Sequence, residues 1–230
     1  MVKLATVRRA GTSSAHMIRL TNTLALFVCC SLDLPAQMFG PGYFPRHNFT
    51  VGAGVGRPRE DLQQFLNDSP GLSVGYGYRF HRNFQADIGL DVQFGAADVR
   101  DFVTTGIGDF RIRDREFLVP FGGRAILPFD RGRFMFSAGG GGAYLRYSEL
   151  LRQPSSDFRI DCRVCTSRSG WGYYALVNAS AFVDRGQHFR VGVTSRFYRG
   201  HTDGDRLGPL PGFRTKDQWI NLIGEFGFSF

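Results

Sequence analysis

Cys162 and Cys165 are the residues whose type and spacing most clearly suggest chemistry, because two cysteines separated by two residues can bind a metal, exchange electrons or form a disulfide. A structural zinc site would need a second ligand pair, and the other two cysteines, Cys29 and Cys30, lie in a segment interpreted below as a signal peptide. A thioredoxin-like role would need a βαβ setting, which the surrounding pattern does not show. In an exported chain the pair is therefore predicted to form a disulfide that shapes a loop tip and stabilises the fold by about 2 kcal/mol.

His201 is the candidate general base, in a polar segment that runs from Arg199 to Asp203. A hydrolase needs a nucleophile and a base within hydrogen-bond reach, and no serine lies near His201 in the sequence. The glycines from Gly52 to Gly56 are not a phosphate-binding loop, because no helix pattern follows a buried parallel strand. Neither segment predicts catalysis, no cofactor or metal is expected, and His201 is expected to be a solvated loop residue.

The composition restricts the elements that must position these residues. The chain has 230 residues, with 30 glycines, 23 phenylalanines and 43% hydrophobic residues. This apolar fraction excludes an intrinsically disordered chain, and glycine spread without a three-residue period disfavours collagen and helical folds. A mean hydropathy of -0.17, with no apolar run of about 18 residues, excludes a helical membrane protein. One β-rich domain, preceded by a targeting segment, fits this length.

Residues 1–36 are predicted to be a secretory signal peptide, with Met17 as an alternative start. Arg19 precedes an apolar stretch that runs to Leu34, and cleavage is expected before Gln37. Removing the segment deletes four basic residues and one acidic residue, which lowers the formal net charge from +8 to +5. A mildly basic exported chain is not expected to bind nucleic acid.

Strict alternation of apolar and polar residues is the strongest pattern in the remaining chain. From Phe84 to Phe94 every even position is apolar, whereas the odd positions are glutamine, aspartate or glycine. A period of two places these sets on opposite faces of a β-strand. The run Gly139–Gly142 leaves the facing of the fourth and fifth strands ambiguous. Eight strands are predicted, over residues 49–57, 72–80, 83–94, 110–127, 133–147, 172–184, 189–198 and 217–230.

The connections between these strands alternate between short and long. The short ones are His81–Arg82, Pro128–Gly132 and Arg185–Gln187, and the long ones cover residues 58–71, 95–109, 148–171 and 200–216. All connections of one kind then share one end of the sheet, as in outer-membrane barrels. Several strands match the roughly 9–11 residues that cross a bilayer at a tilt. The sequence therefore predicts an all-β fold, an eight-stranded antiparallel up-and-down transmembrane β-barrel.

Aromatic residues are predicted to form two girdles on the membrane-facing surface, one at each end of the barrel. The girdle at the short-turn end comprises Phe80, Phe84, Phe134, Phe136, Phe189, Phe226, Phe228 and Phe230. The girdle at the long-loop end comprises Phe94, Tyr144, Tyr147, Trp171, Tyr173, Phe197 and Trp219.

Charged residues on the other face are predicted to fill the interior, which in an eight-stranded barrel is just wide enough for side chains. Opposite charges there must pair to compensate for desolvation. Arg79 is expected to be the nearest partner of Asp87 and Asp91, with Arg124 reaching in from another strand. A salt-bridged plug is the favoured interpretation, and a proton or small-ion path is the alternative. The predicted network is Arg79, Asp87, Asp91, Arg124, Arg190, Arg196 and Glu225.

The last strand resembles the assembly signal of bacterial outer-membrane proteins, because Phe226, Phe228 and the C-terminal Phe230 alternate with other residues. With its eight strands, the chain resembles the small OmpA/OmpX-like outer-membrane β-barrel superfamily. Glu225 departs from the family's signal, which often has a small residue at this position. The resemblance covers about residues 48–230. It implies a Gram-negative outer-membrane location, with residues 37–47 as a periplasmic N-terminal segment.

The resemblance implies a non-catalytic function, either envelope structure or surface binding through four extracellular loops. The implied partners are outer-membrane lipid, lipopolysaccharide, the outer-membrane assembly machinery and an unidentified extracellular ligand. The alternatives are a small-solute or ion channel and a lipid-modifying enzyme, although the serine that barrel-shaped lipid A deacylases carry beside a histidine is not found near His201. The runner-up fold is an exported water-soluble calycin, such as a lipocalin, which would need a polar exterior and an apolar cavity.

Overall fold

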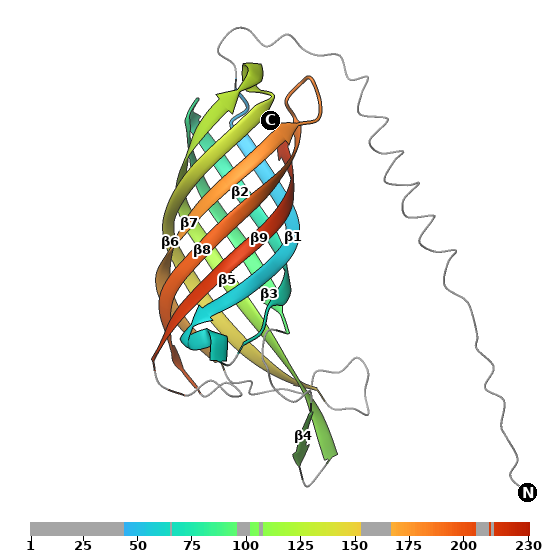
Figure 1. Ribbon diagram of the computed structural model, residues 1–230, viewed down its shortest axis with the longest axis vertical. Helices are drawn as coiled ribbons and strands as arrows, with labels where there is room; N and C mark the ends of the chain where they lie inside the picture. The colour runs from blue at the N-terminus through green and yellow to red at the C-terminus, as the bar shows by residue number, and fades with distance from the viewer. Residues whose placement is uncertain are drawn as a thin grey trace, which may run out of the picture. The chain divides into compact units, whose positions relative to one another are not determined.

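Alternating side chains along long strands build a closed, antiparallel, up-and-down β-barrel (Figure 1). The computed structural model describes residues 44–64, 66–95, 102–105, 108–152, 167–205, 212 and 214–230. Each barrel strand pairs with the next barrel strand along the chain, β3 pairs with β5 rather than with β4, and the β1–β9 pairing joins the first strand to the last. The eight barrel strands are β1 (His47–Glu60), β2 (Ser69–His81), β3 (Phe84–Phe94), β5 (Gly108–Phe129), β6 (Phe134–Arg152), β7 (Ser167–Phe182), β8 (Phe189–Gly204) and β9 (Thr215–Ser229).

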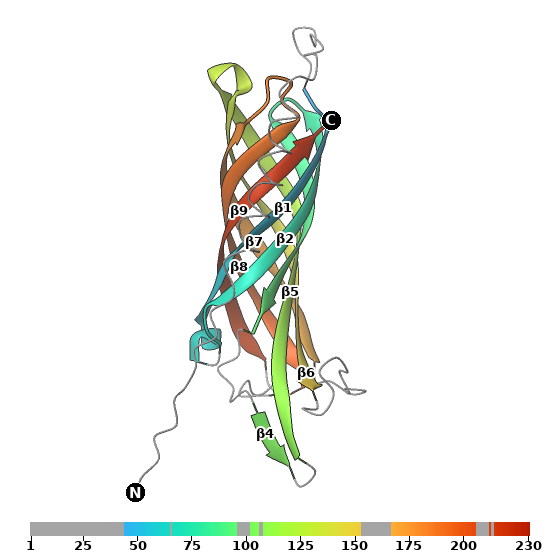
Figure 2. The same ribbon diagram turned by 90° about the vertical axis from the view of Figure 1, so that its right-hand side faces the viewer.

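The predicted fold, strand number and alternation of short and long connections are confirmed. One element was not predicted: the short strand β4 (Phe102–Thr105) pairs with the beginning of β5 and forms a hairpin that projects beyond the barrel (Figure 2). The 3₁₀ helices η1 (Asp61–Gln64) and η2 (Asp130–Gly132) lie in connections at opposite ends. No helix in these described ranges is long and apolar enough to cross a membrane.

Several strands extend further toward the long-loop end than the sequence indicated. The first strand is predicted to end at Arg57, with Pro58 opening the loop, but β1 continues to Glu60 because its β9 side stays paired there after its β2 side has ended. Proline is tolerated where a strand lacks one neighbour. Gly200 was likewise read as the start of a loop, but it lies within β8, where an added Cβ would come within 3.0 Å of the Gly172 Cα. The first and last long connections are therefore shorter than predicted.

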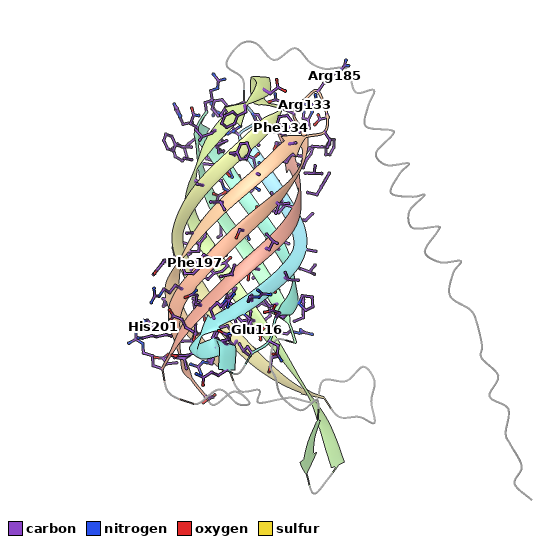
Figure 3. All side chains as sticks on the ribbon, in the orientation of Figure 1. Glu116, Arg133, Phe134, Arg185, Phe197 and His201 are labelled. Carbon is purple, nitrogen blue, oxygen red and sulfur yellow. The ribbon has the colours of Figure 1, made fainter. Side chains whose placement is uncertain are left out.

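The two faces of the barrel wall have the polarity of a membrane-spanning barrel. On β3, Phe84, Ile88 and Leu90 are exposed on the outside, whereas Gln85 and Asp91 are buried inside. The same division holds around the barrel, whose outer surface exposes many large apolar side chains (Figure 3). A water-soluble calycin requires the opposite arrangement, so this alternative fold is wrong. An apolar band outside and a polar interior are what a barrel in lipid needs.

The exposed aromatic residues of one predicted girdle lie at the short-turn end. Members of the other girdle, such as Tyr144 in β6 and Phe197 in β8, lie nearer the middle of their strands, because both strands continue toward the long loops. Phe134 lies at the short-turn end near Arg133 and Arg185, opposite the end that carries His201 (Figure 3). Tyr147 and Trp219, however, are completely buried in the interior, where Trp219 Nε1 donates a hydrogen bond of 3.1 Å to Tyr147 Oη. Because the glycine run in β6 interrupts the alternation, the sequence does not show whether Tyr147 points into or out of the barrel. The facing of Trp219 was readable from Glu225, because both are odd-numbered residues of one strand.

Candidate functional site in the barrel interior

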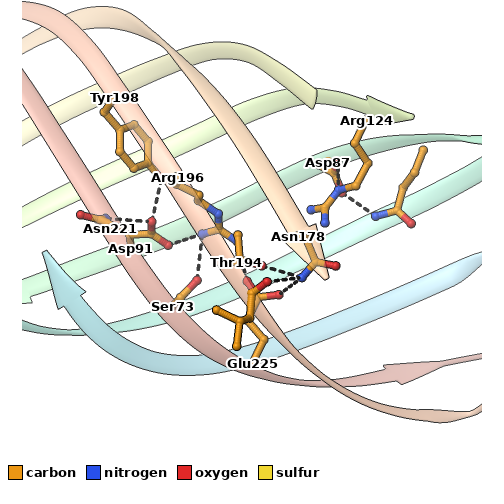
Figure 4. A network of polar contacts seen from close by, with 12 residues as sticks. Ser73, Asp87, Asp91, Arg124, Asn178, Thr194, Arg196, Tyr198, Asn221 and Glu225 are labelled. Carbon is orange, nitrogen blue, oxygen red and sulfur yellow. Dashed lines mark hydrogen bonds and ion pairs between the residues drawn. The ribbon is translucent and has the colours of Figure 1, made fainter. Parts of the chain in front are cut away.

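The centre of the barrel interior is held by one arginine between two carboxylates (Figure 4). Arg196 on β8 forms ion pairs with Asp91 on β3 through Nη1 and with Glu225 on β9 through Nη2, the latter at 3.1 Å. The side chains of Arg196, Asp91 and Glu225 are only 4%, 0% and 6% exposed. Arg196 Nη1 also donates to Ser73 Oγ on β2, at 2.9 Å. This arginine therefore connects strands on opposite sides of the lumen.

Neutral side chains complete the hydrogen bonding of both carboxylates. Tyr198 Oη donates to Asp91 Oδ2 at 2.7 Å, and Asn221 Nδ2 donates to the same oxygen at 3.2 Å. Asn178 Nδ2 lies 3.4 Å from Glu225 Oε2. Asp91 thus keeps two neutral donors apart from its arginine, whereas Glu225 keeps a single long contact.

A second ion pair lies nearer the short-turn end. Arg124 Nε on β5 is 2.6 Å from Asp87 Oδ2 on β3, and both side chains are buried. Gln85 Nε2 donates to Asp87 Oδ1 at 2.6 Å, and Asn48 Nδ2 donates to Gln85 Oε1 at 3.0 Å. Four residues at about 3.4 Å each place Asp87 about 14 Å along the strand from Asp91. The two aspartates therefore have separate cationic partners.

Arg79 is not the partner of either aspartate, so that expectation is wrong. Gly77, not Arg79, lies opposite Asp87 in the β2–β3 ladder, and Arg79 is two residues closer to the short-turn end. Arg79 Nη2 contacts Met135 Sδ at 3.5 Å, and its guanidinium lies 5.8 Å from the centre of the Phe44 ring. Among the described residues, no carboxylate forms an ion pair with Arg79.

Arg190, the last member of the predicted network, is also buried in the interior. It lies against Gly227, where an added Cβ would come within 2.5 Å of Arg190 Nε. All seven predicted charges therefore lie inside the barrel. They form two separate ion-pair centres, with Arg79 and Arg190 outside both.

A further polar cluster, which the sequence did not predict, lies inside the barrel at the ends of β7, β8 and β9 that adjoin the long connections. Asp217 accepts hydrogen bonds from Thr202 Oγ1 and Thr215 Oγ1, the latter at 2.6 Å. Arg168 Nη2 donates to Thr215 Oγ1 at 2.7 Å. These residues stood in segments that were read as loops or at a strand boundary. Continuing the inward parity of Arg196 along β8 would have placed Thr202 inside.

Apolar side chains fill the levels on either side of the charges. One buried cluster begins at the level of the Arg196 centre, where Leu176 is opposite Arg196 and Leu118 is opposite Asp91, and continues toward the long-loop end with Leu145, Tyr174 and Trp219. At the short-turn side a smaller cluster comprises Ile126, Met135 and Phe182. The lumen is therefore occupied by packed side chains above, at and below the Arg196 centre.

Among the described residues, no nucleophile is found within hydrogen-bond reach of the His201 side chain. This residue is exposed on β8, opposite Trp171 and Lys216 in the strand ladders, whereas Glu116 is buried within the barrel. Both lie at the same end (Figure 3). Within the described ranges, no group of three or more histidine, cysteine, aspartate or glutamate side chains is placed to hold a metal ion.

The predicted assembly signal lies at the seam that closes the barrel. Phe226, Phe228 and Phe230 all point outward and are exposed. The backbone of Phe230 exchanges two hydrogen bonds with His47, at 2.8 and 2.9 Å, and the two rings stack with centroids 5.2 Å apart. The predicted disulfide of Cys162 and Cys165 and the predicted signal peptide, residues 1–36, lie outside the described residues, as do residues 37–43.

The arrangement of strands is similar to that of several solved structures, some of which are described as outer-membrane proteins. Neisserial surface protein A (NspA) is 13% identical, with 80% of this chain and 97% of that chain covered and a TM-score of 0.48. For Ail, the attachment invasion locus protein of Yersinia pestis, identity is 12%, coverage 81% and 100%, and the TM-score 0.44. For OprG from Pseudomonas aeruginosa the values are 12%, 81% and 97%, and 0.44. No protein-family model matches the sequence, and no curated protein matches it. At these identities the likeness concerns the fold alone.

Proposed function

We propose that this chain, which has the fold of the small eight-stranded outer-membrane barrels, is a non-catalytic barrel with a closed interior. In this proposal it contributes to envelope structure or binds at the cell surface through four long extracellular loops. It is exported to a Gram-negative type outer membrane through a cleaved signal peptide. Outer-membrane lipid, lipopolysaccharide and the assembly machinery are its proposed partners, together with an unidentified extracellular ligand.

The filled interior is the observation that supports this function best. The Arg196 centre joins β3, β8 and β9 across the lumen, and apolar clusters occupy the levels on both sides of it. A solute crossing the barrel would have to separate buried ion pairs, which costs several kcal/mol for each buried charge that is left without its partner. A barrel that does not conduct presents its loops as the surface available for interaction.

Planar-bilayer recordings test whether the interior is closed. Insertion of the purified protein should produce no steady conductance of porin size, because buried ion pairs and apolar clusters occupy the lumen at successive levels. Insertion is verified separately by the different gel mobilities of unboiled and boiled samples. A reproducible open channel in verified barrels would overturn the proposal and favour the channel alternative.

Loop replacement separates the two non-catalytic roles. A variant in which residues 153–166 are replaced by an Asn-Gly turn should still assemble, because the strands and the interior charges are unchanged. If the loops bind a surface ligand, this variant should lose cell-surface binding while the envelope keeps its resistance to detergent. Cell-surface binding and detergent resistance both equal to those of the wild type, in a test where cells lacking the whole chain lose detergent resistance, would favour the structural role.

A further inference from the structure

A groove on the outer surface of the barrel has the polarity of a lipid-binding site. It lies over β3, β5 and β6, which are neighbouring strands of the sheet, and its volume is about 450 Å³. Its floor and walls are formed by Leu90, Arg115, Phe117, Val119, Tyr144, Arg146 and Ser148. Because these strands form the wall of a barrel with an apolar exterior, the groove opens toward the membrane.

An interruption in the β3–β5 ladder accompanies this groove. Residue pairs are formed at Ile88 and again at Asp91 of β3, but not at the two residues between them, Gly89 and Leu90. Pro120 of β5 stands at this gap, with its Cγ 3.4 Å from the position where a Cβ of residue 89 would lie. Proline has no N–H to donate to a ladder. The β3–β5 pairing therefore lacks two residue pairs at this point, and Leu90, one of the two unpaired residues of β3, lines the groove.

The lining changes from apolar to cationic along the strands. On β5, Val119, Phe117 and Arg115 follow each other in steps of two residues toward the long-loop end, over about 14 Å at 3.4 Å per residue. On β6, Tyr144 and Arg146 follow in the same direction. The order is the one a membrane lipid presents, with its acyl chain toward the bilayer centre and its headgroup toward the surface.

Arg115 and Arg146 are available to a ligand. Arg146 is exposed and Arg115 is half-buried, and neither forms an ion pair with any carboxylate in the described part of the chain. They lie just beyond Tyr144, which packs 5.1 Å from Trp171 in the aromatic girdle, and this is the level of the lipid headgroups. Guanidinium groups recognise phosphate oxygens through paired hydrogen bonds.

We propose that this groove binds an anionic, phosphate-bearing lipid of the leaflet that faces the long loops. The phosphate contacts Arg115 and Arg146, and an acyl chain lies over Phe117, Val119 and Leu90. Basic side chains beside an apolar membrane-embedded surface attract such headgroups. The site rests on the proposed membrane location of the barrel, and it adds a specific lipid contact to it.

Fluorescence quenching by brominated lipids tests this site. Trp171 is 65% exposed on the outer surface beside the groove, whereas Trp219, the other tryptophan, is completely buried within the barrel. The protein is reconstituted into vesicles that contain dibromo-phosphatidylglycerol or dibromo-phosphatidylcholine as a minor component. Quenching of Trp171 should show a roughly tenfold preference for phosphatidylglycerol, because each arginine adds to the attraction.

Matched variants test whether Arg115 and Arg146 cause the preference for phosphatidylglycerol. Arg115→Gln combined with Arg146→Gln should reduce it to below about twofold, whereas the corresponding lysine pair should retain most of it. Arg133→Gln, at the short-turn end, should leave it unchanged. Correct folding of each variant is established by its heat-dependent gel mobility. A folded double glutamine variant with the wild-type preference would overturn the site.

The result for the wild-type protein also distinguishes a failure of the proposed lipid site from a failure of the proposed membrane location. Equal quenching of Trp171 by both brominated lipids would overturn the lipid site but would agree with a membrane-spanning barrel. Quenching by neither lipid would overturn both.

Discussion

Neutralising Arg196 should destabilise the barrel more than any conservative change on its outer surface. Arg196→Met retains an unbranched side chain but leaves Asp91 and Glu225 without a cation in the lumen. Asp91 would keep the hydrogen bonds from Tyr198 and Asn221, whereas Glu225 would keep only the 3.4 Å contact with Asn178. Removing one partner of a buried ion pair typically costs about 3–5 kcal/mol, and here two carboxylates lose the same partner. The free energy of unfolding should therefore fall by about 4–5 kcal/mol.

Urea unfolding in phospholipid vesicles measures this loss, with tryptophan fluorescence and gel mobility as independent probes. The midpoint should move to lower urea while the slope stays constant, because the surface exposed on unfolding is unchanged. Val193→Met on the outward face of the same strand should change the free energy of unfolding by less than about 0.5 kcal/mol.

A triple variant without these three charges shows whether the lost stability comes from unpaired buried charges or from lost packing. Combining Arg196→Met with Asp91→Asn and Glu225→Gln should recover most of the lost stability, because no unpaired charge then remains buried. An Arg196→Met variant within about 1 kcal/mol of the wild type would refute the ion-pair reasoning. A triple variant as unstable as the single one would indicate that packing, not charge, is the cause.

Three other perturbations probe the interior, the seam and the loops. Arg124→Met should lower the free energy of unfolding in urea by about 3 kcal/mol, because it leaves the buried Asp87 carboxylate without its cation. Arg79→Met should lower it by less than about 1 kcal/mol, because Arg79 has no carboxylate partner among the described residues, and equal losses would contradict this difference. Deleting Phe230 should reduce the folded fraction on unboiled gels, because the deletion removes two backbone hydrogen bonds and a stacked ring at the β1–β9 seam, and an unchanged fraction would count against this role. Cys162 and Cys165 should resist alkylation without reductant, and their double serine variant should still insert; free thiols would refute the predicted disulfide.

For most strands, the side chains that point into the barrel could be predicted, because the alternation of residues along one strand determines them. On β3 each residue alternates with its neighbours, so Asp87 and Asp91 were placed inside without knowledge of the adjacent strands. The same parity would have placed Trp219 inside, had it been followed from Glu225. In β6 the glycine run removed the local signal for Tyr147.

Partners and strand ends depend on neighbours that the sequence does not specify. Which arginine reaches Asp87 depends on the stagger of β2 and β5 against β3, and this stagger favours Arg124 over Arg79. The end of β1 depends on pairing with β9, which lies at the other end of the chain, so the predicted end at Arg57 is three residues too early. Interior charge could therefore be predicted, but its pairing could not.

Site-directed spin labelling along β8 tests the central claim, a barrel with lipid outside and a closed polar interior, most directly. Single cysteines are placed from Arg190 to Tyr198 in vesicles, in a background with serine at positions 162 and 165. Collisions with oxygen should peak at Val191, Val193 and Phe197, and a water-soluble nickel complex should reach none of these labels. A label at Thr194 should be shielded from both reagents, and Arg196 is left unlabelled because its replacement would remove both central ion pairs. A nickel complex that reaches the outward positions would contradict the membrane-spanning barrel, and one that reaches the inward positions would contradict the closed interior.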